Sequence, residues 1–145
     1  MDLYTIGFTH KSAEEFFGLL KGAGIHRVLD VRLSNTSQLA GFTKMQDLPY
    51  FLKALCGAEY VHEPLLAPTR ELMERYRKGK GSREEFRSGY LRLLAQRRVA
   101  ERLARDLLEG PTALLCAEPD AAQCHRSFAV EYLARRWPDL RPVHL

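Results

Sequence analysis

The chain has 145 residues, of which 46% are hydrophobic and 28% are charged, and its formal net charge is +4. These values are typical of one globular domain, residues 1–145, and no apolar run reaches the roughly 18 residues that span a membrane. The N-terminus does not combine a basic start with a long apolar stretch, so no secretion signal is predicted. We therefore expect a cytoplasmic protein whose three cysteines are free thiols.

The first half of the chain alternates short apolar runs with helical patterns. Strands are predicted at residues 3–6, 28–31 and 59–62. A first helix follows Ser12, which is a predicted N-cap, and a second helix covers residues 49–57. A polar loop, residues 33–44, separates the second strand from the second helix.

The second half begins with helical patterns at 69–78 and 82–97 and a third over residues 99–108. A buried strand at 112–116, a helix at 124–137 and an edge strand at 142–144 complete the chain. Strands that alternate with helices favour a parallel sheet. The predicted fold class is therefore α/β: a single three-layer domain with a mostly parallel sheet of about five strands and helices on both faces.

Polar and reactive residue types follow the predicted strands. In an open parallel sheet, ligands bind outside the carboxyl ends of the strands, where these residues would meet. The sequence therefore predicts a site at this rim, and the candidates on the first four strands and the loops after them are Gly7, Asp30, Arg32, Tyr60, His62, Cys116 and Glu118.

The segment LLCAEPDAAQCHRS, residues 114–127, places Cys124, His125 and Arg126 at the start of the last helix. A helix N-terminus stabilises anions and thiolates, and an arginine there suits phosphate or sulfate. The layout is analogous to that of rhodaneses and cysteine phosphatases, but Arg126 follows Cys116 by ten positions instead of six. Zinc binding, a Cys116–Cys124 disulfide and a purely structural loop are alternatives. The spacing fits no common zinc motif, so no metal ligand is assigned.

Other features allow both a structural and a functional interpretation. Asp30 and Arg32 form either an ion pair that anchors the strand end or a carboxylate beside an anion-binding guanidinium. Cys56 lies in an apolar helical stretch and is interpreted as a packing residue. The basic cluster at residues 75–83 is either a solvated connection or a contact for nucleic acid.

Four motifs taken together resemble the family called domain of unknown function 488. They are Thr5-Ile-Gly7, Asp30-Val-Arg32, Tyr60-Val-His62, and Leu115-Cys-Ala-Glu118 with Cys124-His-Arg126. The resemblance implies a small bacterial or archaeal α/β protein and no settled activity. The chain departs from the family pattern at two places: Phe8-Thr9-His10 stands where a His-Ser pair is common, and Leu66-Ala67-Pro68 stands where Leu-Gly-Gly is common.

The leading functional hypothesis is an enzyme with an anion- or phosphate-binding site at the rim, although the sequence leaves open whether the protein is an enzyme. The expected catalytic residues are Asp30, Cys116, Glu118, Cys124 and His125, and the expected anion-binding residues are Gly7, Arg32, Tyr60, His62 and Arg126. The substrate would be a phosphorylated small molecule, a nucleotide or a nucleic-acid end. A non-catalytic nucleic-acid-binding module and a structural or regulatory partner protein are the alternatives, and no cofactor is identified.

Overall fold

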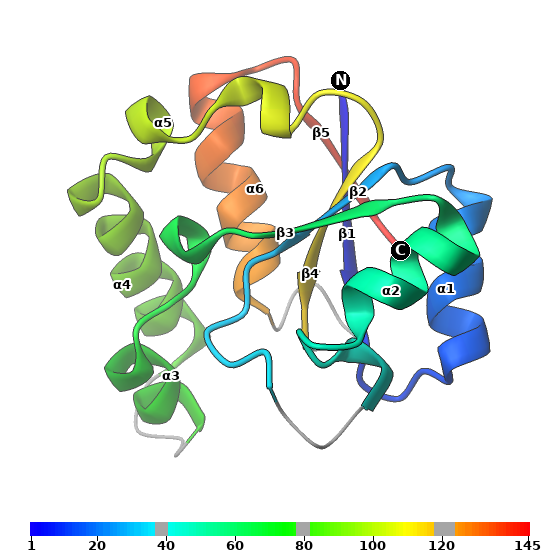
Figure 1. Cartoon of the computed structure of the whole chain (residues 1–145). Helices are drawn as coiled ribbons and strands as arrows, with labels where there is room; N and C mark the ends of the chain where they lie inside the picture. Colours follow the sequence, from blue (N-terminus) through cyan, green and yellow to red (C-terminus); the bar gives the residue numbers. More distant parts are fainter. Residues whose placement is uncertain (37–40, 78–81, 118–123) are drawn as a thin grey trace.

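A computed structural model describes residues 1–36, 41–77, 82–117 and 124–145 of the chain. Its five strands form one parallel sheet in the order β3-β2-β4-β1-β5 (Figure 1). The strands are β1 (Asp2–Gly7), β2 (Arg27–Asp30), β3 (Glu59–His62), β4 (Thr112–Cys116) and β5 (Arg141–His144). All five residues of β4 are buried, as expected for an apolar strand in the middle of a parallel sheet.

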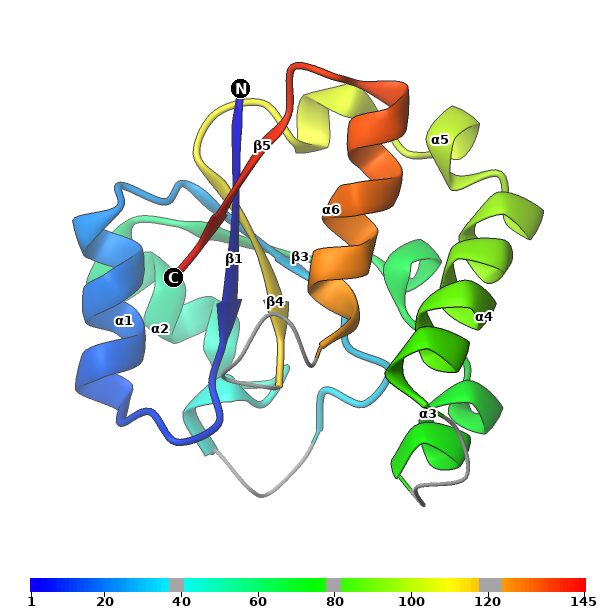
Figure 2. The same cartoon turned by 180° about the vertical axis from the view of Figure 1, so that it is seen from behind.

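Helices cover both faces of the sheet, which confirms the predicted α/β fold (Figures 1 and 2). Two helices, α1 (Ala13–Gly22) and α2 (Leu48–Cys56), cover one face. On the other face, α6 (His125–Arg136) packs against the sheet. The helices α3 (Arg70–Arg77), α4 (Arg83–Gln96) and α5 (Val99–Arg102) lie beside it, with α4 in contact with α6. A separate hydrophobic cluster fills the space between the sheet and each helical layer.

Local sequence signals explain where several helices begin and end. The Ser12 and Ser82 hydroxyls accept hydrogen bonds from backbone N–H groups at the starts of α1 and α4, each at 3.1 Å. Gly57 ends α2 in the left-handed conformation, with φ of 64°. The helix predicted over residues 99–108 is shorter than expected, because the chain becomes extended at Leu103, whose side chain is buried in the core. A 3₁₀ turn at Arg105–Leu107 follows.

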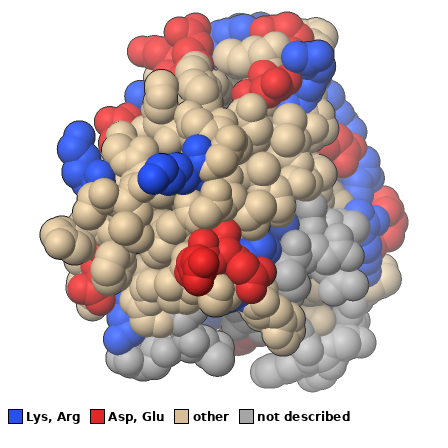
Figure 3. Space-filling view, turned by 90° about the vertical axis from the view of Figure 1, so that its right-hand side faces the viewer, with Lys and Arg blue, Asp and Glu red and all other residues tan. Residues whose placement is uncertain are grey.

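The face formed by α1 and α2 carries a shallow apolar groove, whose lining includes Phe17, Phe42, Phe51 and Leu55. Figure 3 shows a broad uncharged area on this side of the molecule. Among the described residues, no helix combines the length and the apolar character needed to cross a membrane.

Candidate functional site

The carboxyl ends of four strands meet at one rim of the sheet. Gly7, the last residue of β1, is the register partner of Cys116, the last residue of β4. Asp30, which ends β2, has His62 and Leu115 as partners on its two sides. The parallel register therefore brings these strand-end residues to a common edge. The predicted catalytic residue Glu118 lies outside the described residues.

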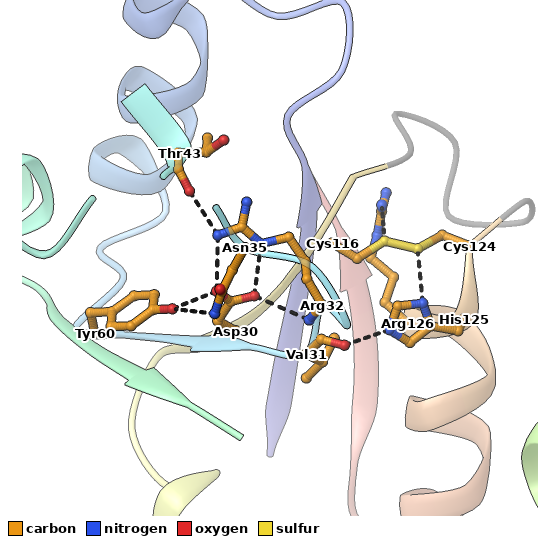
Figure 4. A network of polar contacts seen from close by, with 10 residues as sticks. All are labelled: Asp30, Val31, Arg32, Asn35, Thr43, Tyr60, Cys116, Cys124, His125 and Arg126. Atoms are coloured by element: carbon orange, nitrogen blue, oxygen red, sulfur yellow. Dashed lines mark hydrogen bonds and ion pairs between the residues drawn. A yellow bond between two sulfur atoms is a disulfide. The ribbon is translucent and has the colours of Figure 1, made fainter. Parts of the chain in front are cut away.

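Cys116 and Cys124 form a disulfide, so the expectation of three free thiols is wrong for this pair (Figure 4). Cys116 ends the central strand and Cys124 is the N-cap residue of α6, and their Cα atoms lie 7.2 Å apart. The pair forms because α6 packs back onto the strand from which the connecting segment departs. Cys56 is free and half-buried, and its thiol donates to the Phe17 carbonyl at 3.6 Å.

His125 adopts a defined orientation beside the disulfide. Its Nε2 lies 2.8 Å from the carbonyl oxygen of Val31, which can only accept, so this nitrogen carries the proton. The other ring nitrogen, Nδ1, is then an acceptor, and it lies 3.7 Å from Sγ of Cys124. Burial lowers the pKa of His125 to about 4, with a further contribution from the charge of Arg126. The imidazole is therefore neutral near pH 7.

Arg126 places a guanidinium against the other sulfur. The side chain is fully buried, and Nη1 donates to Sγ of Cys116 at 3.5 Å. Lys11, which follows β1 at the same rim, is partly buried and close enough to Arg126 for their charges to interact. Burial and then the charge of Arg126 lower the pKa of Lys11, while Glu15 acts in the opposite direction. Arg126 thus contacts the Cys116 sulfur directly, and Lys11 is a second cation whose charge interacts with that of Arg126.

Asp30 and Arg32 form a buried ion pair. Nε and Nη2 of Arg32 donate to the two carboxylate oxygens at 2.8 and 2.9 Å, and Nη2 also donates to the Thr43 carbonyl at 2.7 Å. The Tyr60 hydroxyl donates to Oδ2 of Asp30 at 2.5 Å. Burial and this carboxylate raise the pKa of Tyr60, so the hydroxyl remains a donor. The two side chains thus bind each other, which corresponds to the ion pair that anchors the end of the strand.

The ion-pair network and the cysteine cluster adjoin each other (Figure 4). Asp30 and Arg32 flank Val31, whose carbonyl orients His125. His62, by contrast, is exposed on the edge strand β3. Of the predicted residues, four lie close together: Cys116, Cys124, His125 and Arg126. Asp30 and Arg32 adjoin this group through Val31, and Tyr60 is joined to Asp30 by its hydrogen bond. Gly7 lies at the same rim as the strand partner of Cys116.

Two neighbours of the site were not selected from the sequence. Lys11 follows the first strand by four positions, and the signal that marks it in the sequence is its positive charge in a loop at the rim. Tyr90 comes from α4, and its ring meets that of His125 edge-on with centroids 5.4 Å apart. No local pattern marks Tyr90, because α4 reaches the site only through its packing against α6.

In the basic cluster at residues 75–83, residues 78–81 are outside the described parts of the chain. Arg75 is exposed and lies 3.7 Å from Glu85. The guanidinium of Arg83 lies over the ring of Phe128, 4.9 Å from its centroid. Arg75 and Arg83 therefore both make contacts within the protein.

A family described as "Domain of unknown function DUF488" matches residues 12–133 of the chain. The match includes the strand-end residues from Asp30 to Arg126 and both cysteines of the disulfide. No curated protein and no solved structure is matched by the chain. The family description assigns no activity, so the chemistry of the site has to be argued from its geometry.

Proposed function

We propose that this chain, which belongs to the family of the domain of unknown function DUF488, is an enzyme that reacts with an anionic substrate through the Cys116–Cys124 pair. The observation that carries the proposal is the buried guanidinium of Arg126, 3.5 Å from the Cys116 sulfur. A positive charge beside a cysteine favours the thiolate over the thiol once the disulfide is reduced. In the expected cytoplasmic location, a disulfide is usually transient and catalytic.

The electrostatics of the rim support an anionic substrate. Arg126 is shielded from water, and charge interactions are stronger in such surroundings than in solvent. Lys11 adds a second positive charge close to Arg126 and is only partly buried, so it can meet an incoming ligand. In this proposal, Lys11 and Arg126 attract the substrate. Arg32 does not bind the substrate, because its guanidinium is paired with the Asp30 carboxylate next to the site.

The reaction proceeds in two displacements. The Cys116 thiolate attacks one atom of a reducible bond X–Y in the anionic substrate, such as the O–O bond of a peroxide or the S–S bond of a disulfide, which forms a bond between sulfur and X and releases Y⁻. The Cys124 thiolate then attacks the Cys116 sulfur, which forms the disulfide and releases X⁻. The two thiolates lose two electrons and the X–Y bond gains them, so charge and electrons balance. An external dithiol then reduces the disulfide and becomes oxidised itself.

His125 has a supporting role in the second displacement. Its neutral Nδ1 lies 3.7 Å from the Cys124 sulfur and can accept a hydrogen bond from the reduced thiol, which orients Cys124 toward the Cys116 sulfur until the thiol loses its proton to solvent. The Val31 carbonyl holds the imidazole in the required tautomer. The neighbouring Asp30–Arg32 pair fixes this part of the backbone, because the Arg32 backbone N–H also donates to Oδ1 of Asp30 at 3.1 Å.

The test compares two alkylating reagents of similar size, anionic iodoacetate and neutral iodoacetamide. Metal-free, reduced protein at constant pH is treated with each, and peptide mass spectrometry gives separate rates for the three cysteines. We expect the iodoacetate-to-iodoacetamide rate ratio at Cys116 to exceed that at Cys56 by about tenfold. The variants Arg126→Met and Lys11→Met should lower this ratio, while the exposed control Arg135→Met on α6 should not.

Lys11 is only partly buried, so Lys11→Met keeps the test available if Arg126→Met does not fold. Equal ratios at Cys116 and Cys56, or a ratio unchanged in both cation variants, would overturn the proposal. Inorganic phosphate, sulfate and a short single-stranded DNA are then added as competitors. Selective protection of Cys116 by the small anions favours a small anionic substrate, whereas selective protection by DNA favours a larger polyanionic substrate.

A further inference from the structure

Once the disulfide is reduced, Cys116, Cys124 and His125 together present three groups that are common metal ligands. The two sulfur atoms and a ring nitrogen of His125 all lie within 4.8 Å of one another, and all three residues are buried. Adjacent residues such as Cys124 and His125 rarely reach the same ion without a special backbone arrangement. Here Cys124 is extended, with φ of −124° and ψ of 149°, while His125 begins α6. This change of conformation directs both side chains toward Cys116 (Figure 4).

From these contacts we infer that the reduced protein binds one divalent transition-metal ion of the zinc type through Cys116 Sγ, Cys124 Sγ and His125 Nδ1. The inference rests on the proposed function for its reduced thiol pair and adds a regulatory state to the same site. An ion held by both sulfurs prevents their oxidation and occupies the nucleophile. The metal-bound protein is therefore a protected, inactive form, and the metal-free dithiol is the reactive form.

The orientation of His125 is the strongest support for a metal ligand. A histidine that binds a metal through one nitrogen commonly donates the other N–H to a backbone carbonyl or a carboxylate. The Val31 carbonyl fills this role at 2.8 Å and leaves Nδ1 facing the sulfur of Cys124. The observed separation between Nδ1 and this sulfur is 3.7 Å. Two such ligands on a tetrahedral zinc ion, at about 2.0–2.1 Å for nitrogen and 2.3 Å for sulfur, lie about 3.6 Å apart.

The backbone positions of the cysteines are also suitable. Their Cα atoms are 7.2 Å apart, above the range of about 4.4–6.8 Å that is usual for disulfides. Once the S–S bond is reduced, the sulfur atoms can separate to the roughly 3.8 Å needed on a tetrahedral ion while the backbone stays in place. The donor set of two thiolates and one imidazole selects zinc-like ions over magnesium or calcium.

The charges of the three ligands and the contact with Arg126 also fit a divalent metal ion at this site. Two thiolates and a neutral imidazole compensate the charge of a divalent ion, which is required in a buried site. Arg126 donates to the Cys116 sulfur at 3.5 Å, an outer contact of the kind that supports a thiolate ligand. Three protein ligands leave a fourth position, which water or a substrate anion would fill.

The experiment titrates the reduced, full-length protein with Co²⁺ under anaerobic conditions and then displaces Co²⁺ with Zn²⁺. We expect one Co²⁺ per chain, with thiolate-to-cobalt charge-transfer absorption and the visible bands of a tetrahedral centre. Wild-type protein in the disulfide form is the matched control, since it has the same fold without the two thiolates. It should show none of these bands.

Single substitutions then identify the ligands. Cys124→Ser should abolish the charge-transfer pattern of a two-thiolate centre, and His125→Gln should weaken Zn²⁺ binding by at least about tenfold. Cys56→Ser, which removes the cysteine outside the cluster, should bind as the wild type does. If His125→Gln does not fold, a second readout uses the wild-type protein. A small-molecule dithiol in its oxidised form is added to the reduced protein, and the rate at which the Cys116–Cys124 disulfide forms is measured with and without one equivalent of Zn²⁺. We expect Zn²⁺ to slow this reaction at least tenfold.

The inference is overturned if the reduced wild type binds no stoichiometric metal, or if Cys124→Ser and Cys56→Ser bind it equally. Unchanged disulfide formation in the presence of Zn²⁺ would also overturn it. The alkylation experiment on metal-free protein is independent of these results. A retained iodoacetate preference without metal binding refutes only the metal inference, whereas metal binding without that preference refutes only the proposed enzyme.

Discussion

The Tyr60 hydroxyl donates to Oδ2 of Asp30 at 2.5 Å and so connects the edge strand β3 to the buried ion pair at the end of β2. Removing this donor leaves a buried carboxylate with one partner fewer. We expect Tyr60→Phe to lower the free energy of unfolding by about 1–3 kcal/mol, as is typical of a hydrogen bond to a charged group. Urea denaturation measures the change, and Tyr50→Phe is the control because Tyr50 is 71% exposed. Equal stability of the two variants would show that this contact contributes nothing.

The Asp30–Arg32 ion pair should be more costly to break. Asp30→Asn or Arg32→Met alone leaves the other charge buried, and each should cost about 3–5 kcal/mol of unfolding free energy. The double variant should cost less than the sum of the single variants, because it leaves neither charge without its partner. A double-mutant cycle by urea denaturation measures this coupling. Additive costs would mean that the two side chains act independently.

Reduction of the disulfide should destabilise the fold moderately. The linked cysteines are 8 positions apart, and closing a loop of this length contributes about 2–3 kcal/mol through the entropy of the unfolded chain. The midpoint of urea unfolding should therefore fall when a non-metal-binding reductant is added. The double variant Cys116→Ser/Cys124→Ser should be insensitive to the reductant. A wild-type midpoint that does not change on reduction would contradict the expectation.

The contact between α4 and α6 gives a prediction for acid stability. Hydrogen bonds from Arg87, and its charge, lower the pKa of Glu131 below its ordinary value of 4.5, although partial burial opposes this. A carboxyl whose pKa is lower in the folded than in the unfolded chain adds stability above the unfolded value. This contribution is lost as the pH falls from about 4.5 through the lower folded value.

Arg87→Met should therefore reduce the midpoint of thermal unfolding near pH 7, and the difference from the wild type should shrink as the pH falls below 4.5. The exposed residue Arg136, near the end of α6, provides the control variant Arg136→Met. Thermal unfolding across the acid range tests both proteins. A constant difference between Arg87→Met and wild type at every pH would show that the loss comes from packing and not from the charge of Glu131.

Much of the fold could be predicted because its signals are local. Ser12 and Gly57 mark helix ends by their own chemistry, and the apolar run 112–116 indicates a central strand. The gathering of strand-end residues follows from the parallel arrangement alone, and this rule selected Asp30 and Cys116. These features can be predicted without knowing which strands are neighbours in the sheet.

The finer contacts of the site depend on the order of the strands, which no local pattern specifies. Lys11 interacts with Arg126, although the two residues are far apart in sequence, because Lys11 follows β1 and α6 packs against β1. The disulfide likewise depends on how closely α6 returns to the end of β4. The expectation of free thiols was based on the expected compartment, which does not determine the distance between Cys116 and Cys124.

The position of β4 has a consequence for synthesis of the chain on the ribosome. β4 lies between β1 and β2 in the sheet, yet it is translated after both of them. Until residues 112–116 emerge, β1 and β2 each expose a hydrogen-bonding edge that only β4 fills. The nascent protein therefore presents unfilled strand edges for most of its translation, and its folding depends on a late segment that also carries Cys116.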